Sequence, residues 1–311
     1  MRVTSNSFPN TLVDQLGSLA SRQNRLQSQA ATGQRIRLPE DDPMAMQRVI
    51  NLQADAGSLA QYQRNIGHQQ EVAGASYSAL RSLKQISDRV GEIATLADGL
   101  KSPQQLTVYA REMSELIKQG VQLVNTKNPD GYLFAGTRSD QPPFVLTSDT
   151  SGRVASVTYQ GNESVAQSEI SNGVTITAQV PGANTSGSGP RGLITDLGSG
   201  ADFFNHLIAL QDHLLGGDTS SIAATDRAAL ARDEENLILH IGQNGALQSR
   251  LEASLALGKD RSIAIDASVS KEADADLAET LTRLSQTQTA YQAALQSAAA
   301  ILKQSLMDYL R

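Results

Sequence analysis

The sequence contains no cysteine and no tryptophan among its 311 residues. Without cysteine there can be no disulfide framework, thiolate nucleophile, iron–sulfur cluster or cysteine-ligated zinc site. Aromatic residues make up only 4% of the chain, which is thin for the core of a globular enzyme. Basic residues are also few, since 26 lysines and arginines stand against 32 aspartates and glutamates, a net charge of −6. This balance argues against general nucleic-acid binding, which needs a concentrated basic surface.

Long apolar runs are absent as well. No stretch approaches the roughly 20 apolar residues that cross a bilayer, so we expect no membrane insertion. The first nine residues lack the apolar core of a cleaved secretory signal. If the protein leaves the cell, we expect an export route that does not read such a signal.

What the sequence does contain is helical periodicity at both ends. An N-terminal helix is predicted with one heptad stripe, formed by Leu12, Leu16, Leu19 and Leu26. Gly33 is its expected end, because glycine adopts a left-handed conformation without steric cost. Asp42 and Pro43 are typical of an N-cap and the first residue of the next helix. No proline interrupts residues 44–102, so this second helix would be on the order of 85 Å long.

The C-terminal third repeats the pattern. Residues 230–255 carry one apolar stripe, and a second stripe follows after Gly258. Its members are Leu277, Leu281, Leu284, Tyr291, Leu295 and Leu302. Residues 284–302 contain no charged side chain. Each terminal stripe is too narrow to bury itself, so it needs a partner helix from the other terminus or from a second copy.

The middle of the chain changes character. A third helix is expected after Ser102 and Pro103, and a turn follows at residues 128–131. Short alternating runs between residues 142 and 190, broken by glycines, predict a small antiparallel β insert. A short amphipathic helix is expected at residues 203–214.

These elements predict a mainly α fold. It would be a long antiparallel helical rod or coiled coil built from both termini, with a small β-rich insert in the middle. The expected division pairs residues 1–40 with 262–311 as terminal helices and residues 41–137 with 219–261 as a helical rod domain. Residues 138–218 would form the insert.

Residues 26–43, LQSQAATGQRIRLPEDDP, resemble the N-terminal signature of bacterial flagellins and flagellar hook-associated proteins. The resemblance rests on a loop and a helix start, whose residues are Gly33, Arg35, Ile36, Asp41, Asp42 and Pro43. Residues 244–252, 271–279, 293–295 and 305–310 resemble the C-terminal segments of the same family.

A further motif, NPDGYLFAGT at residues 128–137 followed by QPPF, resembles the hook–filament junction branch of this family, hook-associated protein 3. The residues that carry it are Gly131, Tyr132, Leu133, Phe134, Gly136 and Thr137. Filament flagellins usually lack this pattern. A filament flagellin or flagellin-like protein is therefore the alternative interpretation.

The resemblance implies a structural subunit of the extracellular flagellum, not an enzyme, exported through the flagellar type III apparatus without a cleaved signal peptide. Its termini would pair in the innermost part of a self-assembled ring or tube, with both terminal stripes as the assembly seam. The insert would face outward. Implied partners are further copies of the chain, the hook-side junction protein, flagellin, and a cytosolic export chaperone on the C-terminal helix. No cofactor is expected.

Catalytic and metal-binding interpretations have little support in the residues. No nucleophile–base pair, phosphate loop or ligand cluster is visible, so an enzyme or an unrelated helical binding module ranks last. His206 and His213 lie roughly 10 Å apart along a helix, and a metal would need a third inward ligand. Asp41 and Asp42 are better explained by helix capping than as paired catalytic carboxylates. We predict no catalytic, cofactor or metal site.

Charge is distributed unevenly at the termini. Residues 1–40 carry five arginines against two acids, and residues 266–279 carry five acids against one lysine. These segments either contact each other, within the chain or between neighbours, or form two solvated helix faces. Exposed ion pairs contribute little individually, so both interpretations stay open.

Overall fold

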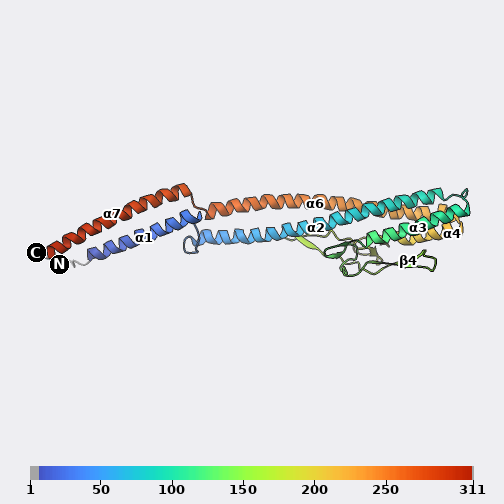
Figure 1. Ribbon diagram of the computed structural model, residues 1–311, viewed down its shortest axis with the longest axis horizontal. Coiled ribbons are helices and arrows are strands. Elements are labelled where there is room, and N and C mark those ends of the chain that lie inside the picture. Colours follow the sequence, from blue (N-terminus) through green and yellow to red (C-terminus); the bar gives the residue numbers. More distant parts are fainter. Residues whose placement is uncertain (1–6, 310–311) are drawn as a thin grey trace. The chain divides into compact units, whose positions relative to one another are not determined.

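The computed structural model describes the backbone of residues 7–309 and the side chains of residues 11–300. Its helices are α1 (Ser7–Thr32), α2 (Pro43–Leu96), α3 (Pro103–Val124), α4 (Phe203–Gly216), α5 (Thr219–Ser221), a π-helical turn (Ile222–Asp226), α6 (Arg227–Ala273) and α7 (Leu277–Tyr309) (Figure 1). All strands of the described residues lie between α3 and α4. The predicted fold class, mainly α with a small β region in the middle, is confirmed.

Helix boundaries follow local sequence signals. Gly33 has φ +72° directly after α1. Asp42 Oδ1 accepts a hydrogen bond from the Ala45 N–H at 3.0 Å and so caps α2. Ser102 and Gln105 form a reciprocal capping box at the start of α3. The predicted ends and starts at these positions are confirmed.

The chain divides into two compact units. The first comprises the described residues of Met1–Ser58 and Asp260–Arg311, and the second is Leu59–Lys259. In the first unit α1 packs along α7 (Figure 1). The boundaries differ from the three-part division expected from the sequence, and the assignment of those parts to inner and outer layers stays a prediction.

Gly258 does not interrupt the C-terminal helices. A Cβ at this position would meet Gln63 and Leu59 at ordinary contact distances of 3.6 to 3.7 Å. The helix α6 continues through Gly258 to Ala273, and a short non-helical link then leads to α7. No described helix is both long enough and apolar enough to cross a membrane.

The hydrophobic core of the second unit lies where helices α2, α3, α4 and α6 meet the insert. Apolar side chains from these four helices form most of it. Four of the five phenylalanines are buried here, namely Phe134, Phe144, Phe203 and Phe204. The ring of Phe204 lies edge-on to those of Phe144 and Phe203, with centroids 5.6 and 5.5 Å apart. These four phenylalanines are thus placed where the insert meets the helices.

The strands of the described residues form four small sheets. Three are antiparallel pairs: β1 (Lys127–Asn128) with β2 (Gly131–Tyr132), β3 (Phe144–Ser148) with β4 (Val154–Tyr159), and β5 (Ser168–Ser171) with β6 (Val174–Ile176). In the fourth, β8 (Thr195–Asp196) pairs with β7 (Ala183–Asn184) in parallel and with β9 (Ala201–Asp202) antiparallel.

The expectation of a wholly antiparallel insert is therefore wrong at β7 and β8. The Asn184 side chain donates hydrogen bonds to the carbonyls of Ser188 and Pro190 at 3.1 and 2.8 Å. These bonds close the Gly/Ser-rich loop between β7 and β8. The strand that follows this loop, β8, runs parallel to β7.

Candidate assembly surface

Two links between successive helices meet in the first unit, and together they are named the crossover: the loop 33–42 between α1 and α2, and the link around residues 272–276 between α6 and α7. Gln34 and Asp274 form an antiparallel bridge. The Ala275 N–H donates to the Gly33 carbonyl at 2.8 Å, and the Arg35 N–H donates to the last carbonyl of α6 at 2.7 Å. Backbone hydrogen bonds thus join the loop 33–42 to the link around residues 272–276.

Carboxylates hold the crossover in shape. Asp41 Oδ2 accepts hydrogen bonds from the backbone N–H groups of Leu38 and Arg37 at 3.0 and 3.1 Å, which lower the pKa of Asp41. Its Oδ1 lies 3.1 Å from the guanidinium of Arg25. The Glu272 carboxylate accepts from Arg48 at 2.8 Å, and this hydrogen bond lowers the pKa of Glu272. Ionised carboxylates are therefore part of the folded geometry.

We expect the crossover to open in acid. A carboxyl whose pKa is lowered on folding contributes stability above its ordinary pKa, about 4, and this stability is lost as pH falls through the folded pKa. Hydrogen exchange at the Ala275 N–H should therefore lose protection between about pH 5 and pH 2. Asp41→Asn should show the lower protection already at pH 6, whereas Asp14→Asn, on the exposed face of α1, should not. Unchanged protection at pH 2 would contradict this account.

The helix α1 buries its predicted stripe in the pair that it forms with α7. Leu26 is buried, and Leu12, Leu16 and Leu19 are half-buried. Its exposed apolar side chain, Val13, lies outside the stripe. The pair within one chain therefore accounts for the α1 stripe.

The helix α7 uses only part of its own stripe. Its buried side chains are Thr280, Thr287 and Ala298, and among the stripe residues Leu284 and Tyr291 are half-buried. The side chains of Leu277, Leu281 and Leu295 are 50%, 56% and 43% exposed. The Leu302 side chain lies outside the described residues.

The three outward leucines, Leu277, Leu281 and Leu295, are called the exposed leucine stripe below. At about 100° per residue, they are centred roughly 80° around α7 from the buried threonines and alanine. The buried face of α7 consists of the small side chains of Thr280, Thr287 and Ala298, and the bulkier leucines lie beside this face. A further helix would be needed to cover them.

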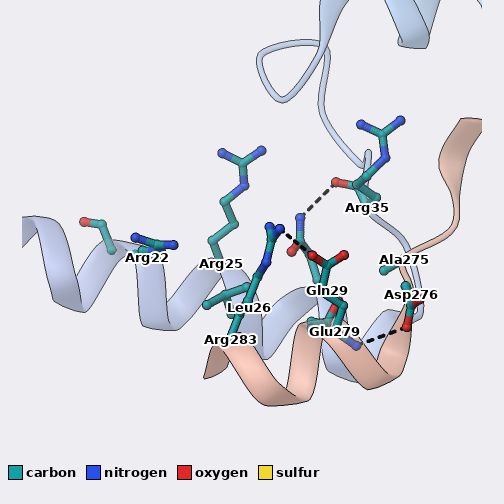
Figure 2. Close-up of a pocket in the computed structure, with 11 residues that line it drawn as sticks. Arg22, Arg25, Leu26, Gln29, Arg35, Ala275, Asp276, Glu279 and Arg283 are labelled. Atoms are coloured by element: carbon teal, nitrogen blue, oxygen red, sulfur yellow. Dashed lines mark hydrogen bonds and ion pairs between the residues drawn. The ribbon is translucent and has the colours of Figure 1, made fainter. Parts of the chain in front are cut away.

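A cleft of about 570 Å³ lies between α1 and the start of α7 (Figure 2). Arg22, Arg25 and Arg35 line one side, and Glu279 and Arg283 pair with each other on the other side. Arg22 makes no hydrogen bond or ion pair within the described side chains. Nor does any ion pair there join residues 1–40 to residues 266–279. The hydrogen bonds that the described residues form between the two charged segments each involve a backbone group, such as the 2.7 Å bond from the Arg35 guanidinium to the Glu272 carbonyl.

Comparison with known proteins gives one family match, between residues 3–139 and the bacterial flagellin N-terminal helical region. Residues 3–139 are thus similar to the N-terminal helical region of bacterial flagellins. They comprise α1, α2, α3, the crossover loop and the motif at 128–137. No curated protein sequence matches the chain.

Solved structures similar to this chain include a flagellar hook-associated protein and FlgL proteins. A hook-associated protein from Vibrio parahaemolyticus is 19% identical, with a TM-score of 0.63 over 75% of this chain and 100% of that one. FlgL from Bacillus cereus is 17% identical, with a TM-score of 0.55 over 71% and 99%. FlgL from Xanthomonas campestris is 15% identical, with a TM-score of 0.58 over 70% and 99%. The chain shares their fold.

Within residues 3–139, the motif of residues 131–137 attaches the insert to the helices. Leu133 and Phe134 are buried, and the Phe134 carbonyl accepts from the Gly182 N–H at 2.8 Å. Gly136 has φ +65°, and a Cβ there would lie 2.3 Å from two oxygens of Asn162. Asn162 Oδ1 in turn accepts from the Thr137 N–H at 2.9 Å. The motif residues therefore have structural roles, with Gly131 and Tyr132 forming the short strand β2.

The histidines that the sequence singled out do not converge on a metal site. No group of three metal-ligating side chains occurs among the described residues. Instead, His206 pairs with Asp233 and His213 with Asp226, each at 2.7 Å. The two aspartates were missed at the sequence level, although their seven-residue spacing matches that of the histidines.

Proposed function

We propose that this chain is a structural subunit of the bacterial flagellum that joins the hook to the filament by self-assembly after type III export. Three observations support the proposal. Residues 3–139 match the flagellin N-terminal helical region, the fold is shared with flagellar hook-associated proteins, and the motif at 128–137 resembles the junction branch. The proposal places the protein in the extracellular flagellum, with the insert facing outward.

The exposed leucine stripe carries the assembly part of this proposal. Three large apolar side chains on one uncharged helix face are costly to leave in water, at about 25 cal/mol per Å² of apolar surface. The α1 partner within the chain leaves them uncovered. A neighbouring copy would supply the missing helix, so that the terminal helices pack into a ring or tube.

The same stripe also bears on export. Before assembly it would be exposed in the cytosol, where an apolar helix face invites aggregation. A cytosolic chaperone bound to the C-terminal helix would cover it until export. After assembly the stripe is occupied by a neighbouring copy, and the hook-side junction protein and flagellin would contact the two ends of the assembled ring.

Growth on purified hooks tests this function. Purified monomer is added to hooks that bear the hook-side junction component, and the added length is read by negative-stain electron microscopy. We expect a short, self-limited addition that then accepts flagellin, and none on hooks stripped of the junction component. Growth into long filaments would make the protein a filament flagellin instead. No addition on complete hooks would overturn the proposal.

A further inference from the structure

Two histidine–aspartate pairs join α4 to the π-helical turn and the start of α6 in the second unit. His206 Nδ1 lies 2.7 Å from Asp233 Oδ2, and His213 Nδ1 lies 2.7 Å from Asp226 Oδ2. The histidines are seven residues apart and so are the aspartates. The pairs therefore form two successive rungs between antiparallel segments, two helical turns apart.

The carboxylates of both rungs are buried and the imidazoles are not. The Asp233 side chain is 0% exposed and that of Asp226 is 6% exposed, whereas those of His206 and His213 are 26% and 33% exposed. A buried carboxylate is costly unless an opposite charge or hydrogen bonds compensate it. A protonated imidazole supplies both, and its exposed edge lets it exchange protons with solvent.

The same face of α6 holds the insert at further points. Asp233 Oδ1 accepts a hydrogen bond from the Asp202 N–H at 2.8 Å, at the end of β9. Asn236 Nδ2 donates to the carbonyls of Gly192 and Leu193 at 2.9 and 2.8 Å. The attachment of α4 and of the last sheet thus passes through Asp233 and its neighbours on α6.

Several charges surround the two rungs. His206 faces Asp233 and Arg232 from α6 and Asp202 from β9, and the hydrogen bond to Asp233 raises the pKa of His206. Burial raises the pKa of Asp233, and the bond from His206 opposes that rise. His213 faces Asp226 and, from the loop before α5, Asp218.

A third histidine, the buried His240 on α6, affects stability with the opposite dependence on pH. His240 hydrogen-bonds the Gly192 carbonyl at 3.2 Å, and burial lowers the pKa of His240, with Arg191 and Asp196 as its charged neighbours. Its contribution to stability is complete above about pH 6.5 and is lost as pH falls below that value. His206, by contrast, contributes fully below about pH 6.5, and its contribution is lost as pH rises through its folded pKa.

We propose that the two rungs form a clasp that holds α4 and the adjoining sheet on α6, and that its strength depends on pH through His206: it holds while His206 is protonated and loosens when His206 loses its proton. Deprotonation of His206 leaves its hydrogen bond to Asp233 possible but removes the positive charge opposite that buried carboxylate. Histidine is the side chain whose ordinary pKa places this change near neutral pH. The clasp is independent of the proposed assembly function, since it lies within the second unit.

Hydrogen exchange on the full-length chain tests the clasp. We expect the protection factors of the α4 amides, corrected for the intrinsic exchange rate, to fall between pH 6.0 and pH 8.5, because the stability that protonated His206 contributes is lost as pH rises through its folded pKa. The double variant His206→Gln with His213→Gln keeps a donor without the charge. It should show the lower protection at both pH values.

The matched control is His68→Gln. His68 also pairs with an aspartate, Asp130, at 2.7 Å, but both side chains are well exposed and lie outside the clasp. This variant should keep the wild-type pH profile. Equal protection of α4 in wild type at both pH values, or pH dependence that persists in the double variant, would overturn the proposal.

A second measurement is independent of how well the double variant folds. The imidazole chemical shifts of His206 in the wild-type chain can be followed by NMR as a function of pH. The proposal requires a titration midpoint above about 6.5, the ordinary histidine value. A midpoint at or below that value would overturn it.

Discussion

Replacing both Leu281 and Leu295 with aspartate should abolish addition of the protein to purified hooks while leaving the second unit folded. Both side chains point away from the buried face of α7, which consists of Thr280, Thr287 and Ala298. The α1–α7 pair should therefore survive the change. What the variant loses is the apolar surface that a neighbouring copy would cover.

The expected effect is large because two costs combine at each site. Removing a leucine from a buried contact costs about 2 kcal/mol, and placing an unpaired carboxylate there costs several kcal/mol more. At about 1.4 kcal/mol per factor of ten, two such sites should weaken association by more than about a thousandfold. Addition should then fall below detection by electron microscopy.

The matched control is Leu100→Asp. Leu100 is 91% exposed between α2 and α3, so this change adds the same charge at a leucine outside the stripe. We expect normal addition from this variant, and circular dichroism and α4 hydrogen exchange should match wild type in all the variants. If the double variant still adds to hooks normally, the exposed leucine stripe is not an assembly contact.

Replacing Phe134 with alanine should lower the free energy of unfolding of the second unit by about 3–5 kcal/mol. The Phe134 side chain is 0% exposed, and its backbone carbonyl accepts from the Gly182 N–H at 2.8 Å and from the Tyr159 hydroxyl at 3.1 Å. Truncation leaves a cavity where the insert meets the helical core. Because whole domains are stable by only about 5–15 kcal/mol, the insert should become loosely attached.

Urea unfolding followed by circular dichroism measures this loss. Val145→Ala is the matched control, because Val145 lies in the same insert on β3 but is 44% exposed. Its free energy of unfolding should change by no more than about 0.5 kcal/mol. A loss below about 1 kcal/mol for Phe134→Ala would show that the motif does not anchor the insert.

Features set by neighbouring residues could be predicted from the sequence. The end of α1 at Gly33, the cap of α2 at Asp42 and the start of α3 at Ser102 depend on bonds within one turn of chain. The fold class could be predicted from the spacing of hydrophobic residues along the sequence, which is also a local property. The resemblance added the family, and the comparisons agree with it over residues 3–139.

Features that depend on distant residues could not be predicted in this way. A heptad stripe shows that α7 has an apolar face, but not how many helices cover it. The packing against α1 leaves Leu281 outward and takes Thr287 inward. The seven-residue spacing of His206 and His213 was visible, but its match to two aspartates on another segment depends on how α4 lies against α6.

The sequence by itself therefore determined the end of α1, the starts of α2 and α3, the long helical termini and the β-rich middle, because capping bonds and periodicity act over a few residues. Only the tertiary structure decided which side of each helix is covered. It also decided that β7 and β8 are parallel and that each of the two histidines meets a buried carboxylate. Those outcomes depend on packing and register between segments far apart in the chain, which no local pattern encodes.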